Sequence, residues 1–287
     1  MILAATFVLS WFLVGAWARV LRARGLGKAV RADGPPAHRL KAGTPSMAGV
    51  PMAAAVAAVV ALTGLGRPEV AALALGFLLI GLADDLAGSL RRPLRAREKL
   101  VLQFAVAGVF SYAVLGRVAY TGWPPLDFLF LLLVVVGAAN AMNFTDGVDG
   151  LAASVGAVLL LPFLGAPLAA AAVGALLGFL WHNAPPARVF MGDAGSEALG
   201  VLIAGLWLLA GAGFYLALAA VVPLAELLSV VVQVLYFRRT GGRRILRMAP
   251  LHHHFELGGW SEGKVVLRFA AVTAAATALA VSLWRGA

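Results

Sequence analysis

One polar stretch holds the residues best suited to chemistry, and it reads Asn140-Ala-Met-Asn143-Phe-Thr-Asp146-Gly147-Val-Asp149-Gly150. Long apolar runs flank it on both sides, at 128–139 and 151–164. Two carboxylates three residues apart lie on one face of a helical turn, glycines let the backbone approach a ligand closely, and asparagines add amide donors and acceptors. The combination predicts a site for a hard cation and a phosphorylated substrate. The alternative interpretation is an ordinary polar loop built of turn residues.

Asp84 and Asp85 form a second acidic motif at the end of another apolar run. Adjacent carboxylates repel each other unless a cation or a base lies nearby. They are therefore candidates for metal binding, or for a base that removes a proton from an acceptor phosphate. The alternative is a pair of helix-end charges solvated at a membrane interface. The basic cluster that follows, residues 91–99, would either grip an anionic lipid or only set the membrane topology.

Asp193 stands between two glycines in the segment Phe190-Met-Gly-Asp193-Ala-Gly-Ser196. It is a good ligand for a hard ion, and the N-terminus of the helix expected after it suits a phosphate.

Nearer the start of the chain, Lys41 offers a point charge for a phosphate or a carbonyl, and hydroxyls follow it in Gly43-Thr44-Pro45-Ser46. That segment is equally consistent with a turn at the start of a helix, capped by a serine.

Three consecutive histidines, His252, His253 and His254, follow Pro250 near the C-terminus. Neighbouring residues on a helix point in different directions, so the three cannot all bind one zinc ion. Neither cysteine nor a His-Glu-x-x-His pattern occurs in the sequence to support a zinc site. Donation of hydrogen bonds to phosphate or sugar oxygens is the better hypothesis.

Helices that cross a membrane must position these motifs, because the chain is 62% hydrophobic and only 13% charged, with a mean hydropathy of +0.92. Soluble domains are less apolar and carry more charge. A span needs about 20 mostly apolar residues, and this rule predicts an all-α, polytopic integral membrane protein with a single transmembrane domain over residues 1–287. Ten helices are expected, at 1–21, 48–65, 69–87, 99–117, 124–141, 151–165, 167–183, 196–212, 214–237 and 264–284.

Several remaining features restrict the function. Pro223 should kink the ninth helix, and Glu226 inside it needs a partner or water. The absence of cysteine excludes disulfide and thiolate chemistry. The net charge of +10 comes from basic loops beside apolar spans, so it does not indicate nucleic-acid binding. The N-terminal segment has neither a basic region nor a clear cleavage site, so we expect a retained first span.

The distribution of lysine and arginine predicts the orientation. Twenty of the 23 fall in loops and span ends after the first, third, fifth, seventh and ninth helices, and the other three are Arg67, Arg117 and Arg285. The positive-inside rule then places the first set in the cytoplasm and both termini outside. All five histidines and every aspartate except Asp127 fall on the same cytoplasmic side. A transporter more often keeps its ionisable groups near the membrane midplane, so this pattern favours an enzyme with a cytoplasmic active site.

Taken together and in order, the motifs resemble those of the bacterial phospho-N-acetylmuramoyl-pentapeptide transferases, of the polyprenyl-phosphate N-acetylhexosamine-1-phosphate transferase superfamily. The matching stretches are K-A-G-T-P-S-M-A-G, A-D-D, N-F-T-D-G-V-D-G-L-A, F-M-G-D-A-G-S and P-L-H-H-H-F-E-L. The resemblance covers essentially the whole chain. It implies ten transmembrane helices in the bacterial inner membrane and a homodimer. It also implies Mg²⁺-dependent transfer of phospho-MurNAc-pentapeptide from its UDP carrier to undecaprenyl phosphate, giving lipid I and UMP in peptidoglycan synthesis.

The resemblance also implies roles for individual residues. Asp193 matches the magnesium ligand, with Asp146 as a second residue near the metal, and Asp84 and Asp85 match the aspartate pair, one of them a proposed base or nucleophile. The direct attack of the lipid phosphate, which is already anionic, is favoured over a covalent aspartyl intermediate. The remaining matches are to residues that contact the substrates or form the catalytic histidine motif: Lys41, Ser46, Lys99, Asn143, Gly147, Asp149, Asn183, Phe190, His252, His253 and His254.

The sequence departs from the family at four positions. Gly88 stands where a lysine is usual, and Arg91 or Arg92 is the candidate substitute for its phosphate contact. Ser46 and Ala48 replace the usual threonine and glycine, and Glu197 replaces a common leucine near Asp193.

Three other functions compete with this assignment. A sister enzyme would transfer N-acetylglucosamine phosphate from its UDP carrier, and a cation-coupled transporter would use the acidic residues for ion binding. A CDP-alcohol phosphotransferase is suggested by Asp146-Gly-Val-Asp149-Gly, but the rest of that family's motif is missing.

Overall fold

The structure is a computed structural model that describes residues 1–25, 27, 41, 43–64, 66–90 and 92–286. Six residues used above for the topology or for a phosphate contact lie outside the described residues: Lys28, Arg31, Asp33, His38, Arg39 and Arg91. Within the described part of the chain every regular element is helical, which confirms the all-α class.

Twelve α-helices and one 3₁₀ turn follow one another along the described residues. Their bounds are α1 (Ile2–Ala23), α2 (Gly49–Thr63), α3 (Pro68–Ser89), α4 (Ala96–Val114), α5 (Pro124–Thr145), α6 (Leu151–Leu160), the 3₁₀ turn η2 (Leu161–Phe163), α7 (Pro167–Asn183), α8 (Gly192–Leu209), α9 (Gly213–Ala219), α10 (Val221–Arg239), α11 (Leu251–Glu256) and α12 (Glu262–Gly286). All ten segments expected from the apolar runs are therefore helical.

Six helices in the described residues are long and apolar enough to cross a membrane: α1, α3, α5, α8, α10 and α12. Three more apolar helical segments are shorter, namely α2, α6 with η2, and α7. The chain is thus an integral membrane protein by helix length and composition. The number of spans and the position of the termini remain predictions.

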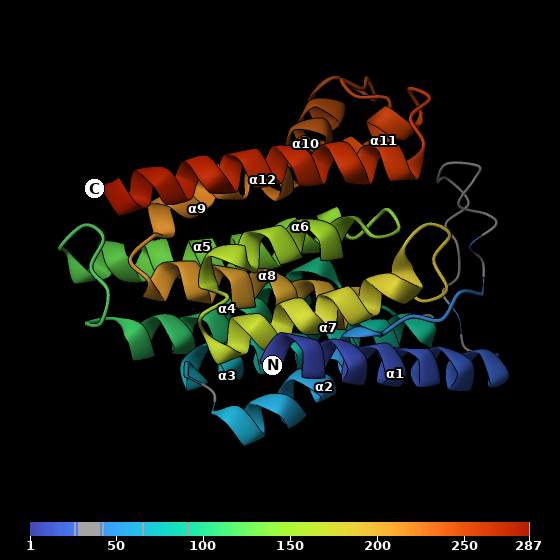
Figure 1. The fold of residues 1–287 in the computed structure, drawn as a ribbon. Coiled ribbons are helices and arrows are strands. Elements are labelled where there is room, and N and C mark those ends of the chain that lie inside the picture. Colours follow the sequence, from blue (N-terminus) through green and yellow to red (C-terminus); the bar gives the residue numbers. More distant parts are fainter. Residues whose placement is uncertain (26, 28–40, 42, 65, 91, 287) are drawn as a thin grey trace.

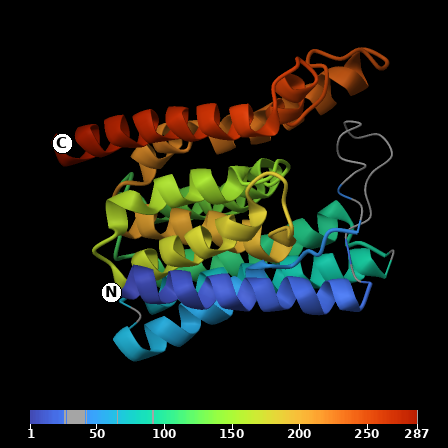
Figure 2. The same ribbon diagram turned by 45° about the vertical axis from the view of Figure 1, so that its right-hand side comes forward.

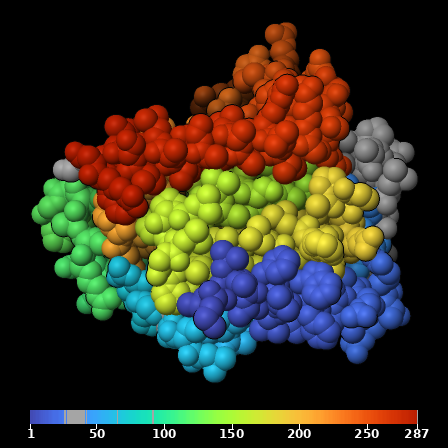
Figure 3. All heavy atoms as spheres, in the orientation of Figure 1, coloured from blue at the N-terminus to red at the C-terminus, as the bar shows by residue number. Residues whose placement is uncertain are grey.

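α8 is the central helix of the bundle, because most of its residues are buried. It packs against α3 and α5, while α1 packs along α7 and α12 crosses α6 and α9. Figures 1 and 2 show α12 on the opposite side of the bundle from α1 and α2, with α10 and α11 extending away beside its N-terminal end. In the space-filling view α12 forms a continuous ridge along one edge of the visible face (Figure 3).

Three local features differ from the expected helices. The ninth helix is divided at Ala220 into α9 and α10, and Pro223 falls in the first turn of α10, where a missing N–H is tolerated. The central helix begins at Gly192 and not at 196, so Asp193 lies in its first turn, where the helix dipole favours a negative charge. The histidine motif forms the short helix α11, which is too brief and too polar to show as a periodic pattern.

The contact between α3 and α8 depends on Gly81. A methyl group at this position would overlap the carbonyl oxygen of Asp193. Only glycine lets the two backbones approach this closely, and the close approach brings the end of α3 beside the first turn of α8.

We predict that Gly81→Ala lowers the thermal unfolding temperature of the protein in detergent. The added methyl group must push two helix backbones apart, which costs about 1–3 kcal/mol in tightly packed interiors. Gly88→Ala on the same helix is the matched control, because a methyl group there meets nothing within 4 Å. The control should be neutral or stabilising by up to about 1 kcal/mol. Equal unfolding temperatures for the two variants would contradict the packing argument.

Candidate active site

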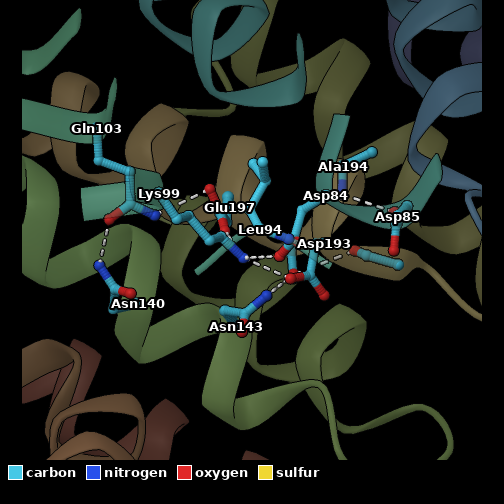
Figure 4. A network of polar contacts seen from close by, with 12 residues as sticks. Asp84, Asp85, Leu94, Lys99, Gln103, Asn140, Asn143, Asp193, Ala194 and Glu197 are labelled. Atoms are coloured by element: carbon cyan, nitrogen blue, oxygen red, sulfur yellow. Dashed lines mark hydrogen bonds and ion pairs between the residues drawn. The ribbon is translucent and has the colours of Figure 1, made fainter. Parts of the chain in front are cut away.

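Among the described residues, Lys99 lies at the centre of the largest group of ion pairs. Its ammonium nitrogen is 3.0 Å from the Asp84 carboxylate, 2.5 Å from that of Asp193 and 2.5 Å from that of Glu197 (Figure 4). The side chain of Lys99 is 13% exposed and that of Glu197 is fully buried. A buried carboxylate is expensive unless it is paired, so Lys99 compensates charges from both α3 and α8.

Local structure fixes each member of this cluster. Asp84 also accepts a hydrogen bond from the Leu94 amide (3.0 Å), which ties the end of α3 to the segment before α4. One turn after Lys99, Gln103 donates to Glu197 (3.0 Å) and accepts from Asn140 of α5 (2.8 Å). The chain of contacts therefore joins α3, α4, α5 and α8 through polar atoms inside an apolar bundle (Figure 4).

The second aspartate of the pair, Asp85, faces the N-terminus of α8. Its carboxylate accepts a hydrogen bond from the Ala194 amide at 3.1 Å. Gly192 has a positive φ of 75°, and a methyl group on it would lie 2.5 Å from an Asp85 oxygen and 3.1 Å from the Ser46 hydroxyl. Glycine is therefore required both by the backbone conformation and by the approach of these side chains.

Residues from the first loop and from α5 complete this end of α8. Ser46 is 9% exposed, and among the described residues its hydroxyl has no hydrogen-bond partner. Phe190 donates its amide hydrogen to the Pro45 carbonyl (2.8 Å), which places Ser46 beside the Asp193 segment. Asn143 donates to the Ser196 hydroxyl at 3.1 Å, so the predicted polar stretch also reaches the start of α8.

A second cluster forms around Asp149 and joins three segments far apart in the sequence. Lys41 lies 2.7 Å from the Asp149 carboxylate and 2.8 Å from that of Glu262, at the start of α12. Asp149 also accepts from the Ala187 amide (2.8 Å). Asn183 accepts from the Gly150 amide and donates to the Val189 carbonyl, both at 2.8 Å.

The three histidines have different surroundings. His252 is buried and lies against Gly147, while its Nδ1 is 3.1 Å from the Glu226 carboxylate. His253 pairs with Glu256 at 2.7 Å. His254 accepts a hydrogen bond from the Arg247 amide at 3.1 Å.

The predicted residues therefore fall into three neighbouring groups linked by the stretch 140–150. The Lys99 cluster holds Asp84 and Asp193, the Asp149 cluster holds Lys41, and the histidine motif meets Gly147. Asp146 closes the C-terminal end of α5 between these groups and is partly exposed.

Sequence analysis missed two partners. Glu262 stands alone in the first turn of the last helix, and Gln103 lies within an apolar run, so neither belongs to a motif. Glu226 was expected to need a partner, and the structure identifies that partner as His252.

The carboxylate oxygens at this site meet some, but not all, of the requirements of a hard cation such as Mg²⁺. Carboxylate oxygens such as those of Asp84, Asp85 and Asp193 are the ligands that Mg²⁺ prefers. Asp84 and Asp193 meet at Lys99, and Asp85 lies beside the Ala194 amide in the first turn of α8 (Figure 4). Within the described residues, no three acidic or histidine side chains are arranged to hold a metal ion by themselves. Lys99 pairs with two of these aspartates, so a cation would have to share them with its ammonium group.

Comparison with known proteins shows similarity along the whole chain. Residues 68–211 match glycosyl transferase family 4. The phospho-N-acetylmuramoyl-pentapeptide-transferase of Deinococcus radiodurans is 44% identical over 305 residues, covering 97% of each chain. Those of Mycobacterium ulcerans (39% identical, covering 99% of this chain and 96% of the relative) and Deinococcus deserti (44%, covering 94% and 95%) are also similar.

We predict that Lys99→Gln strongly destabilises the protein, because it leaves the buried Glu197 carboxylate without its cation. Removal of one partner of a buried pair typically costs about 3–5 kcal/mol. The double variant Lys99→Gln/Glu197→Gln should recover part of this loss, which thermal unfolding in detergent would measure.

Arg117→Gln is the matched control for the Lys99 variant. Arg117 pairs with Glu69 at 3.3 Å but is 65% exposed, and exposed pairs contribute only about 0–1 kcal/mol. If the Lys99 and Arg117 variants unfolded at the same temperature, Lys99 would not compensate the buried charges.

Proposed function

The chain belongs to the phospho-N-acetylmuramoyl-pentapeptide-transferase family, and we propose that it transfers phospho-MurNAc-pentapeptide from UDP-MurNAc-pentapeptide to undecaprenyl phosphate, giving lipid I and UMP in peptidoglycan synthesis. One observation carries the proposal beyond family membership. Three carboxylates converge on Lys99 at the N-terminus of α8, directly beside the Asn143 side chain. The ammonium group and the N-terminus of α8 suit phosphate oxygens, and the carboxylates suit the cation that would offset the charge of a nucleotide sugar and a lipid phosphate.

The reaction exchanges one phosphoanhydride (P–O–P) link for another without a change of oxidation state. An oxygen of the lipid phosphate attacks the phosphorus attached to the sugar, forming a new P–O–P link. The P–O bond to UMP breaks, and UMP leaves with the electron pair. Because the acceptor phosphate is already anionic, strong base catalysis is unnecessary, and we favour this direct attack over an aspartyl intermediate.

The charged residues at the site have complementary tasks. Lys99 would stabilise negative charge on the diphosphate oxygens, and Asp84 and Asp85 would orient the acceptor phosphate or take a proton from it. Asp193, with Asp146 nearby, would hold Mg²⁺, which when bound lowers the energy of that developing charge. Lys99 would then move from Asp193 toward phosphate.

The second cluster would bind the nucleotide part of the donor. Lys41 pairs with Asp149, and Asn183 accepts from the next amide, that of Gly150. Asn183 also holds the backbone of Val189, directly before Phe190, whose ring would stack on the uracil. Ser46 and Asn143 would contact the donor between this cluster and Lys99. The histidine motif, with His252 and His253 as catalytic residues and His254 as a binding residue, would close the site against Gly147.

We further propose that residues 1–287 form one transmembrane transferase domain with ten spans. Both termini would lie outside and the site on the cytoplasmic face of the bacterial inner membrane, where a nucleotide sugar is available. A homodimer would be the working form, and the product would serve cell-wall growth, cell division and cell shape.

The direct test is UMP release by the purified protein in detergent with undecaprenyl phosphate and Mg²⁺. We expect release with UDP-MurNAc-pentapeptide and none with UDP-N-acetylglucosamine, and EDTA should abolish it. Release only with the acetylglucosamine donor would assign the protein to the sister activity. No release with either donor from a folded sample would refute the proposal, and ion flux in liposomes would then test the transporter alternative.

We predict that Asp193→Asn folds normally but loses turnover by about 100-fold or more, as removal of one electrostatic contact to a transition state typically does. Glu69→Gln is the matched control, because Glu69 pairs with Arg117 at the start of α3, at the opposite end of that helix from Asp84 and Asp85. UMP release and thermal unfolding are measured on both variants. Near-normal turnover of Asp193→Asn would show that Asp193 does not hold the metal.

A further inference from the structure

The proposed function assigns no task to Glu226, a fully buried carboxylate in the interior of α10. The described partner of its carboxylate is His252 of α11, which is also fully buried. Buried ionisable side chains inside membrane helices are costly and usually functional. The pair also joins α10 and α11, the two helices that extend away from the bundle in Figures 1 and 2.

The contacts of Glu226 define the hydrogen positions on His252. The His252 backbone amide lies 3.2 and 3.3 Å from the two oxygens of the carboxylate, and because an amide hydrogen can only donate, both oxygens act as acceptors. The ring Nδ1 lies 3.1 Å from the same carboxylate. Because both oxygens already accept from the amide, the ring is the donor in this contact, and Nδ1 carries the hydrogen.

In the tautomer that carries its hydrogen on Nδ1, the other ring nitrogen, Nε2, is a hydrogen-bond acceptor. It is buried, and among the described residues it has no hydrogen-bond partner. It lies against Gly147, where a methyl group would overlap it. Buried polar atoms are nearly always satisfied, so an unsatisfied one beside a binding loop indicates a missing partner.

We propose that Glu226 is a positioning residue that fixes His252 as the Nδ1–H tautomer and directs its bare Nε2 toward the 146–149 loop. There Nε2 accepts a hydrogen bond from a hydroxyl or amide group of the nucleotide-sugar donor. The proposal rests on the proposed transfer reaction for the identity of that ligand. The tautomer itself rests only on the Glu226 and His252 geometry.

The same geometry separates His252 from its two neighbours. His253 is held by Glu256 within α11, and His254 by the backbone of Arg247. Neither of these contacts reaches α10, whereas His252 links α10 to Gly147. Of the three histidines, His252 is therefore the one whose orientation depends on Glu226.

The first experiment records the tautomer of His252 by nitrogen NMR on protein labelled with ¹⁵N-histidine in detergent. The chain has five histidines, and His252→Asn identifies the signal. We expect the wild-type protein to show a protonated Nδ1 and an unprotonated Nε2. A proton on Nε2 instead would overturn the proposal, whether or not the protein releases UMP.

The second experiment compares Glu226→Gln with Ser229→Ala. The control removes the hydroxyl that donates to the backbone carbonyl of Glu226 (2.7 Å) and leaves the Glu226 carboxylate unchanged. Glu226→Gln keeps the shape of the side chain but can no longer impose the tautomer. We expect at least a tenfold loss of UMP release, an altered His252 signal and a normal unfolding temperature. Ser229→Ala should retain wild-type values in all three.

The third experiment places Glu226→Gln in the His252→Asn background. If Glu226 acts through His252, the second substitution causes no further loss of the residual UMP release. An equal loss in both backgrounds would show that Glu226 acts independently and would overturn the proposal. If the wild-type protein released no UMP, the proposed function would fail, and the NMR experiment alone would decide the positioning role.

Discussion

The pairing of three carboxylates with one half-buried ammonium group is the constraint on which the site depends. Among the described residues, Lys99 lies within ion-pair distance of Asp84 on α3 and of Asp193 and Glu197 on α8. Such a cluster cannot form unless α3, α4 and α8 meet at the same level. Apolar packing in a lipid bilayer does not by itself fix that level, so we infer that the polar contacts determine how far each helix slides along its neighbours.

Close backbone packing makes this arrangement possible. Gly81 brings α3 against the first turn of α8, and Gly192 leaves room for Asp85. Helix association in membranes relies on small residues at contacts and on hydrogen bonds between helices. Here both devices act within one turn of Asp193, so the residues that hold the helices together also present the carboxylates to a ligand. Stability and chemistry are therefore coupled at this end of the bundle.

Sequence alone located the helices and the motifs but not their pairing. The ten apolar runs are all helical because length and hydropathy are local properties. The break at Ala220 and the start at Gly192 depend on capping and tertiary contacts, which hydropathy does not record. Lys41 was singled out as a cation for substrate, yet its contact with Glu262 joins residues 221 positions apart. Such a contact has no signature in a single sequence, since Glu262 belongs to no motif.

The long-range pairs explain why the last third of the chain is needed to complete the site. Glu262 holds Lys41 beside Asp149, and Glu226 holds His252 beside Gly147. Each pair satisfies a polar group that would otherwise be costly near lipid, and each ends on the 146–149 loop. The helices α10, α11 and α12 reach the 146–149 loop through these contacts. A movement of these three helices would therefore change the surroundings of that loop from two sides. The same polar contacts that hold α10, α11 and α12 to the loop therefore determine the shape of the binding site.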